Sequence, residues 1–326
     1  MLRDLLAMNY GIQAYEKTVF DGMEGFMDDN YVYFIISGSQ KEMIHMEQAA
    51  LAYYLHENDW PYVTIPVLNN QGGWMTEKDN NGYMVLRAKK PSGIGQSVQG
   101  HGKRLAQLHM AGAMYVYEPE FISSYGQWKD LWADKLVAFE QKAEEEANEH
   151  PSSYYRDVMD FMPYLTGISE NAIQYMQETE HETRFHETDQ GTIAFQRYNK
   201  PFNGHFLWLT DLVYDHPARD LAEHIRRQLL QTEDPMDRIQ TFLDDYQEVR
   251  PLSVFSWRLL YARLLFPIHF FDVIERGFTD STYYSCHAAL MDLINRQPVY
   301  ERRLRTFFDY AGVSSQEMQI PVLHWM

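Results

Sequence analysis

Cysteine is almost absent from this 326-residue sequence, which contains only Cys286. One cysteine excludes an intramolecular disulfide and a zinc site built from several thiolates. The composition is therefore typical of a chain that folds in a reducing compartment. We expect Cys286 to be a small buried residue, because free cysteine packs like an apolar side chain.

Long apolar runs are also missing. The most apolar stretch, residues 264–271, is far too short to cross a bilayer, for which about 20 apolar residues are needed. The first twelve residues contain Asp4 and lack the uninterrupted apolar centre of a signal peptide. We therefore expect synthesis in the cytoplasm and no membrane insertion.

Positive charge is scarce. Lys and Arg number 28 against 46 Asp and Glu, which gives a formal net charge of −18. This balance opposes nonspecific binding to nucleic acid or to anionic membranes, so no nucleic acid partner is expected. What the sequence does contain is 45% hydrophobic and 15% aromatic residues, enough for a sizeable core, and its length favours two lobes.

The first quarter of the chain has the pattern of a small mixed sheet. Residues 32–38, 62–69 and 81–90 are rich in β-branched and aromatic residues and are separated by Gly, Asn and Asp, which predicts strands and hairpins. Between the first two strands, residues 40–59 carry apolar side chains at helical spacing. We predict one helix there.

The remaining chain is mostly helical by pattern. A stretch rich in Gly, Ser and Lys at residues 89–102 separates the two patterns and predicts an inter-lobe crossover. The expected fold class is α+β and bilobal, with an N-terminal lobe at residues 1–88 and a helical C-terminal lobe at residues 103–326. A short hairpin near residues 192–213 interrupts the helices.

Three segments carry a resemblance to a known superfamily: "GKRLAQLHMAG" (102–112), "DHPARDLAEHIR" (215–226) and "WRLLYARLLFPIHFFDVIERGF" (257–278). In this order the chain resembles the aminoglycoside phosphotransferase and choline kinase superfamily, which has a protein-kinase-like fold. Within it the chain is most similar to the kinase-like spore coat proteins of the CotS and YutH type. The resemblance covers almost the whole sequence. His109 and Asp220 lie in the matching segments, where a packed histidine and a helix N-cap completed by Glu223 are the structural interpretations.

Phosphoryl transfer needs a carboxylate that accepts the substrate proton, magnesium ligands and a lysine on the phosphates. The resemblance implies a catalytic loop of the form His-Gly-Asp-x-x-x-x-Asn, and "QRYNKPFN" takes its place. Alignment on proline and asparagine puts Gln196 at the histidine, Tyr198 at the aspartate and Asn203 at the asparagine. A register shifted by one puts Arg197 at the aspartate. Neither register supplies a base, because Tyr ionises near pH ~10 and Arg stays protonated.

The other parts of the implied site are also incomplete. Asp211 is the first candidate for the metal-binding aspartate and Asp215 the second, but their spacing from Asn203 is short for the superfamily. Ile36 or Ser37 stands where the strand lysine is expected, and Glu42 or Glu47 could be the acid that pairs with such a lysine. The phosphate loop, residues 20–29, is surrounded by acidic residues that would repel a triphosphate.

A zinc protease motif is excluded by spacing. In "HETRFH", His181 and His186 are five residues apart, so on a helix they lie about 140° apart and do not face one metal ion. A hydrated, charged linker is the interpretation we adopt.

The missing base and lysine therefore predict a pseudokinase that keeps the fold, and the resemblance implies that it acts in sporulation through protein contacts. The alternative is an active or residual ATP-dependent phosphotransferase for a small hydroxyl or amino substrate, with Asp211 or Asp215 holding magnesium. No cofactor is expected under the first hypothesis, and ATP with magnesium only under the second. The resemblance implies synthesis in the mother cell, a final location in the spore coat and other coat proteins as partners. We interpret Tyr283, Tyr284 and Trp325 as exposed aromatic residues that are available for such contacts.

Overall fold

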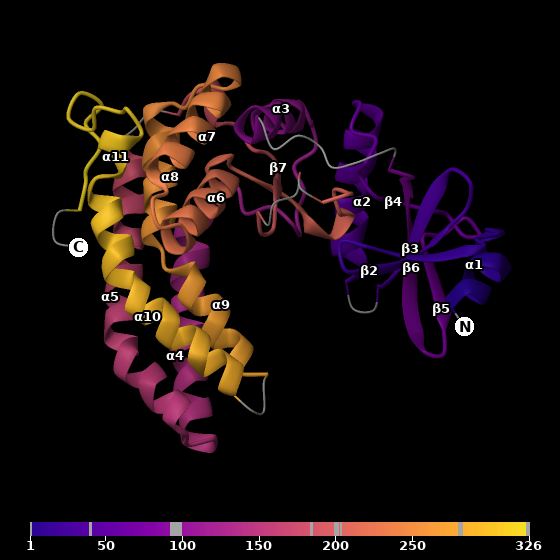
Figure 1. Ribbon diagram of the computed structural model, residues 1–326, viewed down its shortest axis with the longest axis horizontal. Helices are drawn as coiled ribbons and strands as arrows, with labels where there is room; N and C mark the ends of the chain where they lie inside the picture. Colours follow the sequence, from indigo (N-terminus) through magenta and orange to yellow (C-terminus); the bar gives the residue numbers. More distant parts are fainter. Residues whose placement is uncertain are drawn as a thin grey trace. The chain divides into compact units, whose positions relative to one another are not determined.

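The computed structural model describes the chain in two compact units (Figure 1). It describes residues 2–38, 41–91, 100–182, 185–198, 202, 204–279 and 283–323, with the side chains of Leu2, Glu182 and Tyr284 left aside. Unit 1 contains Met1–Ser123 and Gly191–Asp215. Unit 2 contains Ser124–Gln190 and His216–Met326. The two units differ from the lobes expected from composition, because unit 1 also includes the first helix after the crossover and the hairpin.

Unit 1 is built on an antiparallel sheet. Its strand order is β1-β2-β3-β6-β4, with β5 also paired to β6. The strands are β1 (Glu16–Phe20), β2 (Met23–Met27), β3 (Tyr31–Ser37), β4 (Ile65–Pro66), β5 (Met75–Lys78) and β6 (Asn81–Lys89). The predicted strands at residues 32–38 and 81–90 are therefore present as β3 and β6. The run at 62–69 forms only the short β4.

Alternation along β3 gives its two faces different neighbours. On one face Tyr33 joins a buried cluster with Leu5, Leu6 and Tyr10 of helix α1 (Leu2–Tyr10). On the opposite face Phe34 and its neighbours two residues away are also buried. A strand covered on both faces reads as a continuous apolar run, which is what residues 31–36 show. The helix at residues 2–10 was not predicted from the sequence.

Two further helices complete unit 1. Helix α2 (Glu42–Glu57) corresponds to the helix predicted at 40–59. Helix α3 (His101–Ala113) begins at the end of the crossover predicted at 89–102, of which residues 92–99 lie outside the described residues. Helix α3 packs on β7 (Thr192–Phe195), which forms a hairpin with β8 (Leu212–Asp215). The short helix η2 (Leu209–Asp211) lies between the two strands, directly before β8. The hairpin pairs Thr192 with Asp215 at one end and Phe195 with Leu212 at the other.

Unit 2 is helical. Its elements are α4 (Trp128–Glu149), α5 (Ser153–Glu182), η1 (Glu187–Asp189), α6 (Ala218–Gln231), α7 (Met236–Val249), α8 (Val254–Leu265), α9 (Ile268–Gly277), α10 (Tyr284–Arg305) and α11 (Phe307–Tyr310). Aromatic rings fill its core: the Trp132 ring stacks on Phe266 with centroids 4.5 Å apart, and the Phe139 ring meets Phe271 edge to face at 4.6 Å. The prediction that Phe266, Phe270 and Phe271 serve core packing is confirmed, and Cys286 is buried as expected.

Two expectations for unit 2 are wrong. Asp220 is not a helix N-cap, because α6 begins at Ala218 with Pro217 at the cap, and Asp220 lies one turn inside, fully buried. Tyr283 is not an exposed aromatic, since its ring stacks on Tyr154 at 5.6 Å with an interplanar angle of 6°. Trp325 and the Tyr284 side chain lie outside the described residues. No helix within the described ranges is long and apolar enough to cross a membrane.

Candidate functional site

Tyr198 occupies the position of the catalytic aspartate in the proline-anchored register, and it is buried. Its side chain is 1% exposed, and its ring lies 5.9 Å from Phe195 and 6.5 Å from Phe202. Phe202 is itself buried against Trp60, with ring centroids 6.3 Å apart. The described part of the loop is therefore packed through the aromatic rings of Tyr198 and Phe202.

The other loop positions do not supply a base. Gln196 is exposed, and Arg197 donates from Nη1 to the main-chain oxygen of Gln196. In the shifted register Arg197 would stand at the aspartate, and its guanidinium stays protonated at any ordinary pH. Asn203 lies outside the described residues.

The two candidate metal ligands differ in exposure. The side chain of Asp211 is exposed, although nearby protein atoms desolvate it enough to raise the pKa of its carboxyl group. Asp215 is completely buried at the end of β8. Within the described residues, no three His, Cys, Asp or Glu side chains gather as metal ligands, so the structure brings neither aspartate into a ready-made cluster.

Polar residues of α2 bind main-chain groups. Gln48 donates from Nε2 to the carbonyl oxygens of Thr210 at 2.9 Å and Leu212 at 3.2 Å, on either side of Asp211. Glu47 accepts hydrogen bonds from three successive main-chain N–H groups at residues 120–122. Glu47 is therefore engaged by the backbone, while Glu42 is exposed.

The position expected for the phosphate-binding lysine is apolar. Ile36 lies on the same face of β3 as Phe34 and is 9% exposed, while Ser37 is exposed at the strand end. Lys41 is exposed immediately before α2, as the N-cap residue. Of the two residues that the sequence places at the lysine position, one is therefore a buried hydrocarbon side chain and the other an exposed hydroxyl.

Asp21 binds the segment that follows the degenerate loop. It lies in the two-residue turn between β1 and β2, with φ of 51°, followed by Gly22 with φ of 83°. Its carboxylate accepts hydrogen bonds from the main-chain N–H groups of His205, at 3.0 and 3.1 Å, and Phe206, at 3.3 Å. The indole N–H of Trp208 donates to it at 3.3 Å, and His205 Nδ1 lies 2.9 Å away.

These contacts stabilise the charged form of Asp21. Burial alone would raise the pKa of its carboxyl group, but the hydrogen bonds from the His205 side chain and from the main chain outweigh that effect, so the pKa is lowered. Aromatic contacts also hold the β1–β2 turn against residues 205–206, because the Phe20 ring lies 4.9 Å from the His205 ring and 5.4 Å from the Phe206 ring. The acidic turn that would repel a phosphate thus binds the protein's own backbone.

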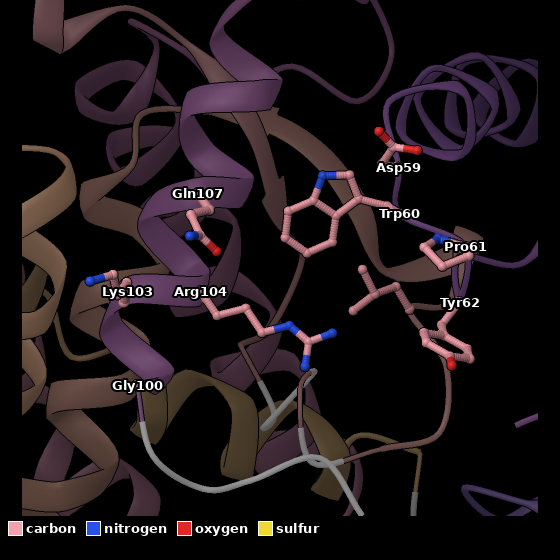
Figure 2. Close-up of a pocket in the computed structure, with 9 residues that line it drawn as sticks. Asp59, Trp60, Pro61, Tyr62, Gly100, Lys103, Arg104 and Gln107 are labelled. Carbon is pink, nitrogen blue, oxygen red and sulfur yellow. The ribbon is translucent and has the colours of Figure 1, made fainter. Parts of the chain in front are cut away.

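A cavity of about 450 Å³ lies elsewhere in unit 1, between the end of α2 and the start of α3 (Figure 2). Figure 2 shows the Trp60 ring, the Gln107 amide and the Arg104 guanidinium facing the same space, with the Lys103 ammonium directed away. Arg104 also lies 4.9 Å from the Phe202 ring centroid. Neither Asp21 nor Asp211 lines this cavity, so it is separate from the implied phosphotransfer site.

Similarity to known protein sequences identifies the family of the chain. The family described as "Spore coat putative kinase YutH" matches residues 3–307. The chain belongs to the spore coat YutH family. The Bacillus subtilis (strain 168) relative named "Endospore coat-associated protein YutH" is 32% identical, and the match covers 100% of this chain and 98% of that protein.

Solved structures support the kinase-like fold of this YutH family member. An aminoglycoside phosphotransferase from Alicyclobacillus acidocaldarius matches with a TM-score of 0.59 at 12% identity, covering 92% of this chain and 93% of the other. The amicoumacin kinase hAmiN matches with a TM-score of 0.56 at 14% identity, covering 93% of each chain. At these identities the similarity establishes the fold and carries no activity across.

The first resembling segment of the YutH-family chain has a packing role. In "GKRLAQLHMAG", His109 is completely buried and its main-chain oxygen accepts a hydrogen bond from Thr192 Oγ1 at 2.7 Å. Gly112 lies against strand β7, where a Cβ atom would come within 2.5 Å of the Ile193 nitrogen. Only glycine allows α3 and β7 to approach this closely.

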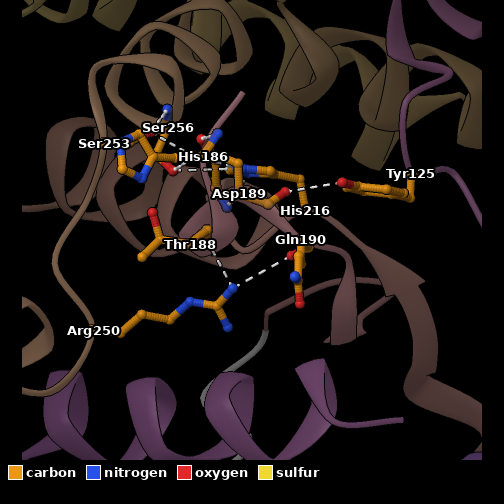
Figure 3. Close-up of polar contacts among 10 residues, drawn as sticks. Tyr125, His186, Thr188, Asp189, Gln190, His216, Arg250, Ser253 and Ser256 are labelled. Carbon is orange, nitrogen blue, oxygen red and sulfur yellow. Dashed lines mark hydrogen bonds and ion pairs between the residues drawn. The ribbon is translucent and has the colours of Figure 1, made fainter. Parts of the chain in front are cut away.

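The second segment, "DHPARDLAEHIR", contributes to a buried polar network in unit 2 (Figure 3). The Asp189 carboxylate accepts hydrogen bonds from the hydroxyl groups of Ser253 and Ser256, each at 2.5 Å, and lies 3.7 Å from His216 Nε2. His216 Nδ1 accepts from the main-chain N–H of Ala218, so Nε2 carries the proton in the neutral ring.

This network is structural. Asp189, His216 and Ser256 are 0%, 2% and 1% exposed, so the centre of the network is closed to solvent. Burial would raise the pKa of Asp189, but hydrogen bonds from His216, Ser253 and Ser256 lower it overall. Tyr125 also donates to the main-chain oxygen of Asp189 (Figure 3). No sequence motif pointed to Asp189, which was missed.

The third segment, residues 257–278, is broken by Pro267 into α8 and α9. Arg226 of α6 donates to the main-chain oxygen atoms of Arg263 and Phe266 at this break. The His269 side chain is partly buried beside it, and desolvation, followed by the charge of Arg226, lowers its pKa to about 3. His269 is therefore a neutral core residue at physiological pH.

Proposed function

We propose that this protein is a pseudokinase: a kinase-like scaffold that associates with the endospore coat and acts there through protein contacts, without transferring phosphate. Its membership of the spore coat YutH family and the coat association in the name of its Bacillus subtilis relative support the location. Other coat proteins are the proposed partners. Synthesis in the mother cell followed by deposition in the coat is the proposed route.

The buried position of Tyr198 is the observation that carries the loss of catalysis. A general base must lie within hydrogen-bond reach of the substrate proton and be deprotonated at the working pH. Tyr198 is 1% exposed among aromatic rings and ordinarily ionises near pH ~10. It fulfils neither condition.

The lysine position supports the same proposal independently. Ile36, which the sequence places at the lysine position, is buried and has no charge to offer a triphosphate. In a reaction that depends mainly on positioning and electrostatics, losing the ammonium group removes part of the stabilisation of the transferring phosphoryl group. An exposed Asp211 remains, but one carboxylate cannot replace a base, a lysine and a metal cluster together.

Exposed apolar side chains support the interaction role. Met43 and Phe121 line a hollow of about 760 Å³ in unit 1 and are each 51% exposed. A few residues before Phe121 in the chain, Val116 and Tyr117 are 80% and 72% exposed. A group of methionine and aromatic side chains of this kind suits adaptable protein contacts.

The direct test measures nucleotide binding and phosphate transfer in the wild-type protein. We expect the melting temperature to be the same with and without ATP and magnesium, because only ligands that bind the native state raise it. No labelled product should form from ATP with small hydroxyl or amino acceptors. Phosphorylated product would overturn the proposal and establish the alternative, an ATP-dependent phosphotransferase.

A matched variant tests the interaction role. Val116→Asp adds a charge at an exposed apolar position and should leave the melting temperature unchanged while reducing incorporation into the coat of sporulating cells. Val137→Asp, at another exposed position, in unit 2, is the control. Equal coat incorporation of both variants and wild type would contradict a role for this surface.

A further inference from the structure

The donors around Asp21 form a compact group within a few residues of one another. Two are the consecutive main-chain N–H groups of His205 and Phe206, and the third is the indole N–H of Trp208. The His205 ring nitrogen Nδ1 lies beside them, 2.9 Å from the same carboxylate. Consecutive main-chain N–H groups directed at one point are a common way in which proteins bind small anions.

The space at this point admits an anion closely. Asp21 Oδ2 lies 3.0 Å from where a Cβ atom would be at residue 204, so Gly204 lets the carboxylate approach the chain without obstruction. The Asp21 side chain is 19% exposed and the His205 side chain 53% exposed. The group of donors is therefore shielded on one side and open to solvent on the other.

We propose that residues 204–208 form an oxyanion-binding cradle, which the Asp21 carboxylate occupies as an internal ligand in place of a phosphate group. The β1–β2 turn, which covers the nucleotide phosphates in kinases, closes onto the chain itself. The proposal rests on the proposed function and adds a mechanism for it: the phosphate position is filled by the protein.

Covalent attachment favours the internal ligand. Because Asp21 is held in a hairpin turn near its donors, it competes with free anions at a high effective concentration. Aromatic contacts of Phe20 with His205 and Phe206 hold the turn in place. Free phosphate can bind here only after Asp21 is removed or displaced.

The test replaces Asp21 while keeping its turn. Asp21→Gly suits the positive φ of this position and removes the carboxylate. Asp79→Gly is the matched control, because Asp79 is an exposed aspartate at φ of 52° in the β5–β6 turn. Thermal unfolding of both variants and wild type is followed at constant ionic strength while inorganic phosphate replaces chloride.

We expect the melting temperature of Asp21→Gly to rise with phosphate concentration and those of wild type and Asp79→Gly to stay constant. ATP without metal should act like phosphate on Asp21→Gly, whereas adenosine should have no effect. An equal response of all three proteins, or a response to adenosine as large as that to ATP, would overturn the oxyanion cradle.

A second variant and a second measurement keep the proposal testable if Asp21→Gly unfolds. Asp21→Asn keeps the size of the side chain without its charge, so the amides of His205 and Phe206 should exchange hydrogen faster than in wild type and be slowed again by phosphate. Adding Trp208→Phe should weaken the phosphate response by removing one donor. Unchanged exchange in Asp21→Asn would overturn the proposal.

The two proposals fail separately. Phosphate transfer by the wild-type protein would contradict the pseudokinase function whatever Asp21→Gly does. No phosphate response in folded Asp21→Gly would contradict only the cradle, because the loss of catalysis rests on Tyr198.

Discussion

Gly112 lies so close to strand β7 that a Cβ atom at this position would come within 2.5 Å of both the Ile193 nitrogen and the Thr192 hydroxyl oxygen. Backbone atoms cannot move aside cheaply, so Gly112→Ala should lower the free energy of unfolding by about 1–3 kcal/mol. Gly167→Ala in α5 is the control: nothing lies within 4 Å of its added Cβ, and alanine should stabilise the helix by about 0.5–1 kcal/mol. Urea unfolding checks both, and equal effects would contradict the close approach.

Restoring an aspartate at the catalytic position should damage the fold without creating an enzyme. Tyr198→Asp places a carboxylate among Phe195 and Phe202, and we expect it to lower the free energy of unfolding by about 3 kcal/mol or more. Tyr198→Phe keeps the ring and should cost clearly less. Urea denaturation and an ATP consumption assay measure the two effects. A stable, active Tyr198→Asp variant would show that the loop still forms a working site.

Removing the central carboxylate of the unit 2 network should destabilise the protein strongly. Asp189→Ala leaves the hydroxyl groups of Ser253 and Ser256 without their acceptor in a buried site, with an expected loss of about 2–4 kcal/mol. The exposed neighbour Glu187 supplies the control, Glu187→Ala, which should stay within about 0.5 kcal/mol of wild type. Similar melting curves for the two variants would show that the network contributes little.

The same carboxylate predicts a pH dependence. The folded-state pKa of Asp189 is lowered, mainly because hydrogen bonds from His216 and the two serines outweigh its burial. Its contribution to stability is therefore complete above the unfolded pKa of about 3.9 and is lost as pH falls through the lower folded value. Between pH ~5 and pH ~3 wild type should lose more stability than Asp189→Ala. Parallel stability curves in acid would contradict this assignment.

Gln48 provides a further test in unit 1. Gln48→Ala removes the donor to the carbonyl oxygens of Thr210 and Leu212, and we expect a loss of about 1–3 kcal/mol together with faster hydrogen exchange in η2 and β8. Glu57→Ala, an exposed change in the same helix, is the comparison. If exchange in η2 and β8 is unaffected by Gln48→Ala, the helix does not hold this segment.

Patterns of apolar residues were the part of the fold that the sequence revealed best. Helix α2 and strands β3 and β6 follow from local periodicity, because each buries one continuous face or both faces. The helix at residues 2–10 was not predicted because it is short and its burial depends on distant partners such as Tyr33. The capping prediction for Asp220 failed because the N-cap of the helix is Pro217, three residues before the position that the capping box indicates.

Candidate site residues were predicted less completely, for a physical reason. The sequence places Tyr198 at the expected base position in one of two registers, but its burial depends on rings such as Phe195 and Phe202 that meet it only in the fold. Asp21 was interpreted as a residue that repels phosphate, yet its partners lie 184 positions away at His205. Asp189 likewise meets Ser253 and Ser256 only after folding. Contacts of this range leave no local signature in a single sequence.

Two neighbouring residues of helix α2 hydrogen-bond to the main chain, one as an acceptor and the other as a donor. Glu47 accepts from the main chain at residues 120–122, while Gln48 donates to the main chain around Asp211. In protein kinases the corresponding helix moves to make or break an ion pair with the strand lysine, and this movement switches activity. Here the strand position holds Ile36, and both side chains bind fixed backbone. These bonds fix α2 to the main chain on both sides, so a rigid displacement of this helix would break hydrogen bonds at residues 120–122 and on either side of Asp211 together.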